Sequence, residues 1–241
     1  MKKRLLTVFL FLLSASASIQ SQTLDEILHK FYAANAQDTL LKITTMKVTG
    51  KMIQGSLEIP YTQTISRPSS FRFELTFQGI TMIQTFNGKE GWTLSPFSGS
   101  TTAQPYSDDD IKTTRYSADI DGMLWNPAEK GYTLTYDGQD DMEGTLCFIL
   151  KIVTRDGDIF KYYIDSDSYI PLRLYSKVKV LGNQSESDTY YSNYKMIRGI
   201  PVALKIESKS NGVTAGTNII DKVEFDTPLS PGMFDKPETR K

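Results

Sequence analysis

The feature that most constrains this chain is a run of alternating apolar and polar residues between Ser66 and Pro96. Successive side chains of a strand point to opposite faces, so the apolar members of residues 71–77 share one face. These members are Phe71, Phe73, Leu75 and Phe77. Gln78-Gly79 and Asn87-Gly88 are turn signals that divide the run into successive strands. The run therefore predicts a sheet with an unusually aromatic face.

A longer series of strand-like segments fills residues 131–225. Compact turns between them favour antiparallel neighbours over crossover helices. We expect strands over 132–136, 145–154, 159–164, 172–180, 186–195, 202–209 and 218–225, with turns at Asp137-Gly138, Asp156-Gly157, Leu181-Gly182-Asn183, Arg198-Gly199 and Asn211-Gly212. Strands over 44–52 and 57–61 precede them, and Pro60, which lacks an amide donor, suggests an edge or a bulge. The chain is thus predicted to build one large sheet in sequence order.

An exposed aromatic face of this size is unfavourable in water, so helices, a second sheet or a ligand must cover it. The sequence also predicts two helices with apolar faces. The first follows Thr23, which can form a capping box with Glu26. The second begins at Ser107 or Asp108, where the acidic run 108–110 suits the positive end of the helix dipole. We expect its apolar face to be Ile111, Tyr116 and Ile120, its end to be Gly122, and the cluster Met123, Leu124 and Trp125 to follow it.

The first residues have the pattern of a secretory signal peptide. Met1-Lys2-Lys3-Arg4 is positively charged, residues 5–13 are apolar, and Ala15-Ser16-Ala17 offers a cleavage site. A membrane anchor is the competing interpretation, but the apolar run is about half of the roughly 20 residues that span a bilayer. No cysteine follows the apolar core, which excludes lipid attachment at a mature N-terminal cysteine. We expect a signal peptide over 1–22, cleaved near 17–22, and a single soluble domain over 23–241.

Composition argues against several classes of partner and chemistry. The formal net charge of −1 gives no support to nucleic acid as a partner. The only histidine, His29, lies on the first predicted helix among residues that are not metal ligands, and the only cysteine, Cys147, lies in an apolar run. No phosphate-binding glycine loop, metal-ligand set or nucleophile with a partner base is visible. We therefore expect no catalytic residues, no metal and no cofactor.

Several short motifs, taken in their order along the chain, resemble those of the LolA/LolB-like family of periplasmic lipoprotein carriers. Arg67-Pro68 is followed by Phe71 and Phe73, and Asn87-Gly88-Lys89 is followed by Trp92 and Pro96. The second half adds residues 153–157, 163–165 with 170–172, 191–201 and the closing segment 231–237. The similarity covers nearly the whole chain after the signal peptide.

The resemblance implies a fold of class α+β: a large curved antiparallel sheet that forms an unclosed half β-barrel, with helices plugging its concave apolar face. It also implies a non-enzymatic periplasmic carrier that binds acyl chains of lipoproteins or free lipids and shuttles them toward the outer membrane. The partners it implies are an inner-membrane donor complex and an outer-membrane acceptor, with the carrier itself a monomer.

The same resemblance suggests which residues act. The apolar groove would include Phe71, Phe73, Leu75 and Phe77 with Trp92 nearby, and the lid would include Ile111, Tyr116, Ile120, Met123, Leu124 and Trp125. Arg67, next to Pro68, would hold the lid closed in the empty form by hydrogen bonds to carbonyls at a helix end. The alternative for Arg67 is an ordinary surface residue. The alternative for the protein is an envelope sensor or protein-interaction module on the same fold.

Overall fold

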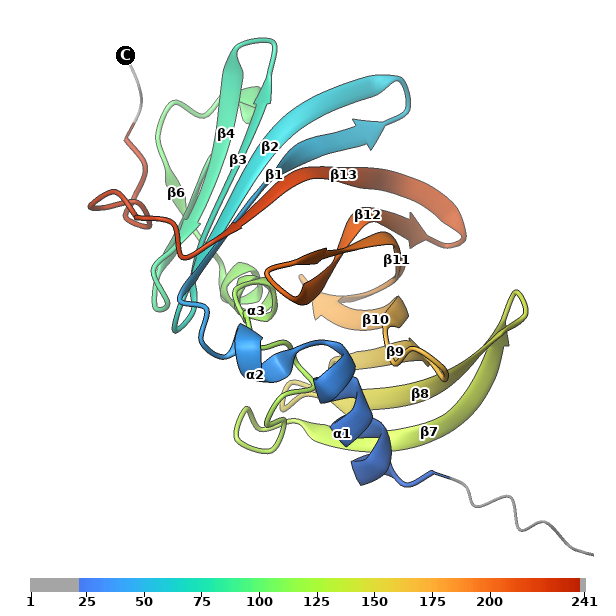
Figure 1. Cartoon of the computed structure of the whole chain (residues 1–241). Coiled ribbons are helices and arrows are strands. Elements are labelled where there is room, and N and C mark those ends of the chain that lie inside the picture. Colours follow the sequence, from blue (N-terminus) through green and yellow to red (C-terminus); the bar gives the residue numbers. More distant parts are fainter. Residues whose placement is uncertain (1–21, 239–241) are drawn as a thin grey trace, which may run out of the picture.

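The computed structural model describes residues 22–238, so all of the predicted signal peptide except Gln22 lies outside the described residues. A single antiparallel sheet of 13 strands curves around the helices (Figure 1). The helices are α1 (Leu24–Ala34), α2 (Gln37–Leu40), the 3-10 turn η1 (Pro96–Ser98) and α3 (Asp108–Ser117). The strands are β1 (Thr45–Gln54), β2 (Leu57–Ser66), β3 (Ser70–Phe77), β4 (Ile80–Phe86), β5 (Gly91–Leu94), β6 (Gln104–Pro105), β7 (Thr133–Met142), β8 (Thr145–Val153), β9 (Ile159–Asp165), β10 (Pro171–Val180), β11 (Asn183–Ile197), β12 (Ile200–Ser210) and β13 (Val213–Phe225).

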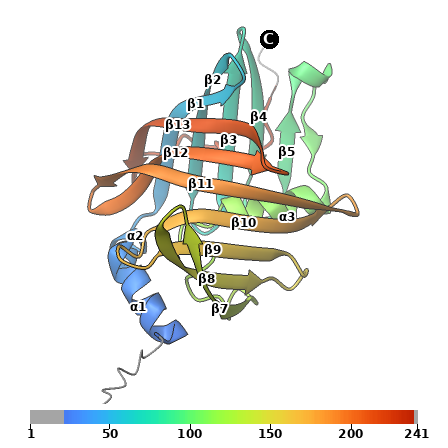
Figure 2. The same cartoon turned by 90° about the vertical axis from the view of Figure 1, so that its right-hand side faces the viewer.

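The sheet is an open half-barrel. Its strand order is β6-β5-β4-β3-β2-β1-β13-β12-β11-β10-β9-β8-β7, and within the described residues β6 and β7 do not pair with each other. Figure 2 shows β10–β13 crossing the molecule at a steep angle to β2–β4, which is the result of the accumulated twist of the sheet. The helices lie inside the curve (Figure 1). This arrangement confirms the predicted fold class.

Two-residue turns produce the sequential strand order. In Arg198-Gly199 both residues have positive φ, 52° and 81°, as type I′ hairpin turns require. The same pair of positive φ values occurs at Gln78-Gly79, Leu181-Gly182 and Asn211-Gly212. Because each of these turns joins neighbouring strands, the dipeptides seen in the sequence account for much of the topology.

Two predictions about strand interruptions are corrected by the structure. Asp137-Gly138 is not a turn: it forms a β-bulge inside β7, where the register with β8 shifts between Tyr136 and Gln139. The turn lies at Glu143-Gly144 instead. Pro60 is not in an edge strand, since β2 lies between β1 and β3. Its missing N–H costs little there, because the pairing of β2 with β3 begins only at the next residue, Tyr61.

Helix α1 covers the β7–β9 end of the sheet. Thr23 and Glu26 form the predicted capping box. Ile27 and Phe31 of α1 are buried in the largest core cluster. That cluster also contains Met123, Leu124, Phe148, Leu150, Ile152, Phe160 and Ile164. The amphipathic pattern of α1 therefore positions it as a permanent part of the core.

Helix α3 begins as predicted but ends early. Ser107 caps it and forms a capping box with Asp110. The helix stops at Ser117, so Ile120 is not on it and Gly122 does not end it. Aspartate is a poor helix former, and the carboxylates of Asp119 and Asp121 are engaged outside the helix by Lys130 and Arg67. Residues 118–125 consequently run as turns along the inner face of the sheet.

Residues 95–107, between the Ser66–Pro96 run and α3, contain two short regular elements, η1 and β6, and β6 pairs with β5. Cys147 is buried in the core, and burial raises the pKa of its thiol to about 11.

Among residues 22–238, none of the helices combines the length and the apolar character needed to cross a membrane.

Candidate functional site

A largely apolar cavity of about 430 Å³ lies on the concave side of the sheet. Its wall combines strands from both halves of the chain with α2 and the turn segment at Ile120. The lining residues are Asn35, Leu40, Met46, Val48, Met52, Tyr61, Gln63, Phe73, Ile120, Tyr162, Pro171, Tyr191, Tyr194, Ile200, Pro201, Val202, Ala203, Ile206, Asn218, Ile220, Val223 and Phe225. This volume falls within the range of about 300–1,000 Å³ that is usual for small-molecule sites.

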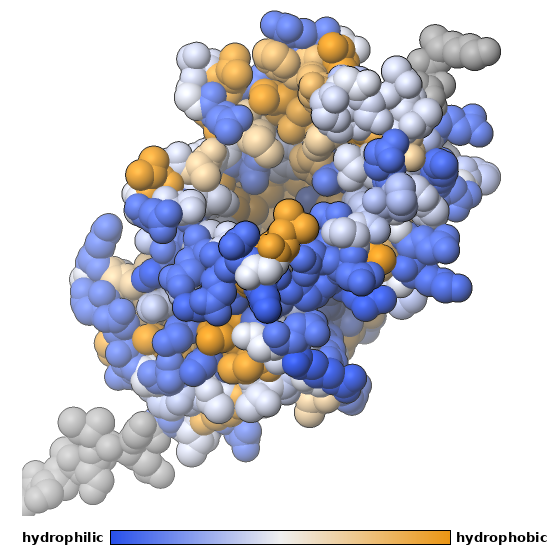
Figure 3. Space-filling view, turned by 180° about the vertical axis from the view of Figure 1, so that it is seen from behind, coloured by the Kyte–Doolittle hydropathy of each residue, from blue (hydrophilic) through white to orange (hydrophobic). Residues whose placement is uncertain are grey.

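The surface is also hollowed on the side seen in Figure 3. Apolar side chains gather above this hollow, over the part of the sheet formed by β1–β4. Ile80, at the tip of the β3–β4 hairpin, is 43% exposed. The concave face is therefore incompletely covered by the protein's own side chains.

The residues predicted to form the groove lie on one face but have different surroundings. Phe71 pairs with Ile65 and Phe73 with Gln63, which places the alternate residues Phe71, Phe73, Leu75 and Phe77 on the same face. Of these four, Phe73 lines the cavity and stacks on Tyr61 with ring centroids 5.6 Å apart. Phe71 is buried against residues 118–120, and Leu75 packs at the margin of a second core cluster. Phe77 is half-buried.

Trp92 does not belong to the groove, which corrects the sequence prediction. It pairs with Thr85, and Thr85 pairs with Arg72, whose side chain points away from Phe71 and Phe73. The physical reason is the register: Phe86 pairs with Gly91, so Trp92, one residue further, falls on the opposite face. There Trp92 packs against a small cluster of Ile83, Leu94 and Ala103.

The sequence analysis did not predict the residues of the second half of the chain that line the cavity. Tyr162 of β9 and Tyr191 and Tyr194 of β11 line the cavity together with apolar residues of β12 and β13. Local alternation could not assign Tyr191 and Tyr194 to one face, because they are three residues apart. Asn193 between them has a φ of 55°, which interrupts the regular strand geometry. Only the curvature of the whole sheet brings these residues opposite Phe73.

The predicted lid residues are divided between two core regions. Ile111 and Ile120 pack with Phe71, Phe86 and Ala118 near β3 and β4. Met123 and Leu124 are buried against α1 and β8–β9, and Tyr116 packs edge-on against Phe160 with ring centroids 5.2 Å apart. Trp125 packs edge-on against Tyr32 of α1, whose hydroxyl donates to the Leu124 carbonyl at 2.6 Å.

Arg67 joins three segments of the chain at one end of the cavity. It lies in the turn between β2 and β3, next to Pro68. Its Nε donates to the Ile43 carbonyl at 2.6 Å and one terminal nitrogen donates to the Leu40 carbonyl at 3.0 Å, both at the end of α2. The same guanidinium forms a bidentate pair with Asp121 at 2.5 and 2.8 Å. The hydrogen bonds that the guanidinium donates to Asp121 raise the pKa of Arg67.

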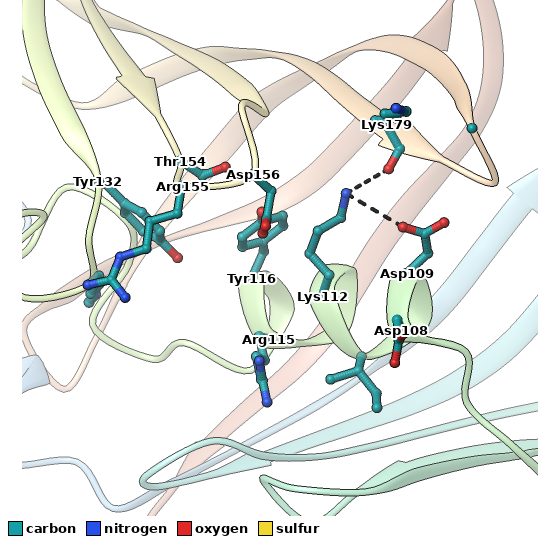
Figure 4. A pocket seen from close by; sticks show the side chains of 13 residues that line it. Asp108, Asp109, Lys112, Arg115, Tyr116, Tyr132, Thr154, Arg155, Asp156 and Lys179 are labelled. Atoms are coloured by element: carbon teal, nitrogen blue, oxygen red, sulfur yellow. Dashed lines mark hydrogen bonds and ion pairs between the residues drawn. The ribbon is translucent and has the colours of Figure 1, made fainter.

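A second, polar pocket of about 900 Å³ lies between α3 and the β8–β10 end of the sheet (Figure 4). Behind it, the carboxylate of Asp158 is only 1% exposed. It accepts hydrogen bonds from the Tyr116 hydroxyl and the Lys179 amide, each at 2.9 Å, and pairs with the Lys112 ammonium at 3.1 Å. Lys112 also donates to the Lys179 carbonyl at 2.6 Å (Figure 4). These contacts attach α3 to the sheet.

Clusters of potential metal ligands were sought among the described residues. Residues 22–238 contain no group of three or more His, Cys, Asp or Glu side chains that could hold a metal ion. His29 is exposed on α1. What the geometry offers is an apolar space bounded by a sheet and by short helical segments that polar contacts hold in place.

Comparison with solved structures identifies the fold. A LolA superfamily protein from Nitrosomonas europaea superposes with a TM-score of 0.61 at 11% sequence identity, over 90% of this chain and 99% of that one. A DUF1329 family protein from Desulfovibrio piger gives 0.59 at 12% identity, over 87% and 97% of the two chains. A domain from Vibrio parahaemolyticus, described as an outer membrane lipoprotein-sorting protein domain, gives 0.57 at 11%, over 86% and 95%. The sequence itself matches no protein-family model and no curated protein.

Proposed function

We propose that this chain, which has the fold of the LolA superfamily, is a periplasmic carrier that binds the acyl chains of lipids or lipoproteins without catalysing a reaction. The observation that carries the proposal is the apolar cavity, which is enclosed by the sheet and by segments that Arg67 ties together. A carrier needs such a space and a cover that can be displaced. The fold shared with the three solved structures is consistent with this role.

Apolar burial supplies the binding free energy in this proposal. Moving one methylene from water into an apolar site contributes about 0.8 kcal/mol, so a chain of about sixteen carbons gains on the order of 10 kcal/mol before ordering costs. No covalent step is needed. In this proposal the signal peptide predicted over 1–22 directs the chain to the periplasm. There it would receive cargo from an inner-membrane donor and pass it to an outer-membrane acceptor, as the family resemblance implies.

Arg67 is the proposed latch of the empty form. Its guanidinium bridges the end of α2 and Asp121, so entry of an acyl chain between these segments would separate the bridge. Hydrogen bonds to a charged group are worth about 1.5–3 kcal/mol each, enough to shift an open–closed ratio tenfold or more. Ile120, next to Asp121, lines the cavity, which links the latch to the bound chain.

The test is binding of a fluorescent fatty acid to the mature protein and to Phe73→Glu. Phe73 lines the cavity, so a carboxylate there should weaken binding at least tenfold through the cost of burying charge beside the acyl chain. Thr76→Glu is the matched control, because it adds the same charge to the opposite face of β3 and should leave affinity unchanged. Circular dichroism checks that both variants fold.

Native mass spectrometry of protein purified from its own periplasm is the complementary measurement. Bound acyl species would support the carrier. A folded wild-type protein that retains no lipid and binds no fatty acid would refute it.

A further inference from the structure

The cavity is not uniformly apolar, because phenol and amide groups project from its wall. Tyr61, Tyr162 and Tyr191 line it together with Gln63 and Asn218. Tyr194 also lines the cavity, but its hydroxyl donates to the Pro171 carbonyl at 2.5 Å. Among residues 22–238, the other three hydroxyls and the two amide side chains make no hydrogen bond to the protein, and none of them is among the unpaired polar atoms that are closed to solvent, so water can reach them. A wall built only to hold a hydrocarbon chain would not need these groups.

Strand register directs these groups to the same space. Tyr162 pairs with Leu150 and Leu174, and Tyr191 pairs with Ile206, which itself lines the cavity. Tyr61 reaches the cavity from β2 on the other side and stacks on Phe73. The phenols thus converge from three distant strands of the sheet.

These phenols remain hydrogen-bond donors at any ordinary pH. Burial raises the pKa of Tyr61 and of Tyr191 to about 12 each. Burial also raises the pKa of Tyr162, and the neighbouring Tyr191 adds to that effect. Protonated phenols and amide NH₂ groups in a low-dielectric wall need acceptors, since an unpaired polar group there costs free energy.

We propose that the cavity binds the carbonyl-bearing part of an acyl lipid, with the ester or amide carbonyl accepting hydrogen bonds from Tyr162 and Tyr191. This inference rests on the proposed carrier function and specifies its ligand: an acyl ester or amide rather than a saturated hydrocarbon. An acyl chain attached to the bound carbonyl has an apolar path along Phe73. The methylenes supply affinity, and the phenols select for the linkage.

Selection follows from the cost of leaving donors unpaired. In the empty cavity water can satisfy the phenols. A ligand that displaces this water without offering an acceptor leaves the donors unsatisfied, whereas a carbonyl replaces the lost hydrogen bonds. The wall should therefore discriminate between ligands of equal length and shape that differ only in the carbonyl oxygen.

The test uses methyl palmitate and methyl hexadecyl ether, in which a methylene replaces the carbonyl. Each competes with a fluorescent fatty acid for the mature protein. We expect wild type to bind the ester about tenfold more tightly, equivalent to about 1.4 kcal/mol. In a double variant with Tyr162→Phe and Tyr191→Phe, the ester should bind about as tightly as the ether. The affinity for the ether should remain that of the wild type. Tyr136→Phe, a half-buried tyrosine outside the cavity, should keep the tenfold preference.

A second readout does not depend on affinity. The infrared carbonyl band of bound ¹³C-carbonyl methyl palmitate should lie at lower wavenumber in wild type than in the double variant, because hydrogen bonding weakens the carbonyl bond. Equal binding of ester and ether by wild type, with no band shift, would overturn the carbonyl site and leave the carrier function standing. Failure of folded wild type to bind either probe would overturn both.

Discussion

The two ends of the α3 region are held to the sheet by different kinds of contact. The helix itself is attached through Lys112 and Tyr116 to Asp158, a carboxylate that is 1% exposed. The 118–125 segment that follows is attached through an ion pair between Asp121 and Arg67. The side chain of Asp121 is 19% exposed and that of Arg67 is 27% exposed. The first attachment therefore rests on a carboxylate that is closed to water, whereas both side chains of the second ion pair are partly exposed.

Solvent access decides what each attachment can do. A buried carboxylate that loses its partners has no water to replace them, so opening that contact is costly. A partly exposed ion pair can exchange its partner for water at lower cost. We therefore expect α3 to stay fixed during uptake of cargo, together with Met123 and Leu124, which are buried against α1, and residues 118–122 to move with α2. The moving part is then smaller than the lid predicted from the sequence, which includes Ile111 and Tyr116 of α3.

The largest effect should come from Asp158→Ala. Removing the carboxylate takes the nearer of two anionic partners from the Lys112 ammonium, which keeps Asp109 at 3.7 Å. It also leaves the Tyr116 hydroxyl and the Lys179 amide without this acceptor. We expect the free energy of unfolding in urea to fall by about 3 kcal/mol, within the range for breaking a buried pair. The control is Asp156→Ala, since Asp156 is exposed and makes no hydrogen bond or ion pair within residues 22–238. If both variants lost the same small amount, the buried attachment would not be the stronger one.

Arg67→Leu should lower the free energy of unfolding less than Asp158→Ala does, but it should favour the open form of the protein more. It removes the bridge between α2 and Asp121, so we expect a loss of about 2 kcal/mol in the free energy of unfolding. Amide hydrogen exchange should accelerate over 118–122 but not over α3. Because the closed empty form is weakened, release of loaded fatty acid to acceptor vesicles should slow by about tenfold while binding persists.

Arg173→Leu serves as the matched control for Arg67. Arg173 also pairs with an aspartate, Asp188, at 2.6 Å, and the two side chains are 23% and 25% exposed. It pairs with Tyr163 rather than with the cavity-lining Tyr162, so its side chain lies on the opposite face of the sheet from the cavity. The substitution should change neither exchange over 118–122 nor release. Wild-type release by Arg67→Leu would remove Arg67 from the mechanism, and faster exchange spread evenly over α3 would contradict the division between fixed and moving parts.

The smallest effect should come from Tyr116→Phe. Only one of the contacts to Asp158 is lost, and the ring still packs against Phe160. We expect a loss of about 1 kcal/mol in thermal or urea unfolding, the usual value for one hydrogen bond. Fatty-acid binding should be unchanged. A loss as large as that of Asp158→Ala would show that the hydroxyl, rather than Lys112, balances the buried charge.

Local patterns predicted the strands, most turns and the helix caps, because each depends on residues close together in sequence. Thr23 with Glu26 and Ser107 at α3 are such cases. Asp137-Gly138 failed, since the dipeptide suits a bulge as well as a turn and only the pairing of β7 with β8 decides between them.

The site was less accessible to sequence reasoning because it depends on distant pairings. Alternation alone places Phe71, Phe73, Leu75 and Phe77 on one face. That Trp92 lies on the opposite face could be recognised only from the register of β4 with β5. The tyrosines opposite Phe73 and the Arg67–Asp121 pair join residues far apart in the chain. Their proximity is a property of the curved sheet, which no single segment encodes.

A sheet that stays open keeps two free rims, and each offers unpaired amides and carbonyls on which a second chain could add a strand. At one rim, β6 has two residues and ends in Pro105, which cannot donate. At the other, β7 is bent by its bulge and carries Asp137, Asp140 and Asp141. Shortness, proline, distortion and like charge all hinder such addition. The chain can thus expose an incomplete barrel without a ready template for aggregation.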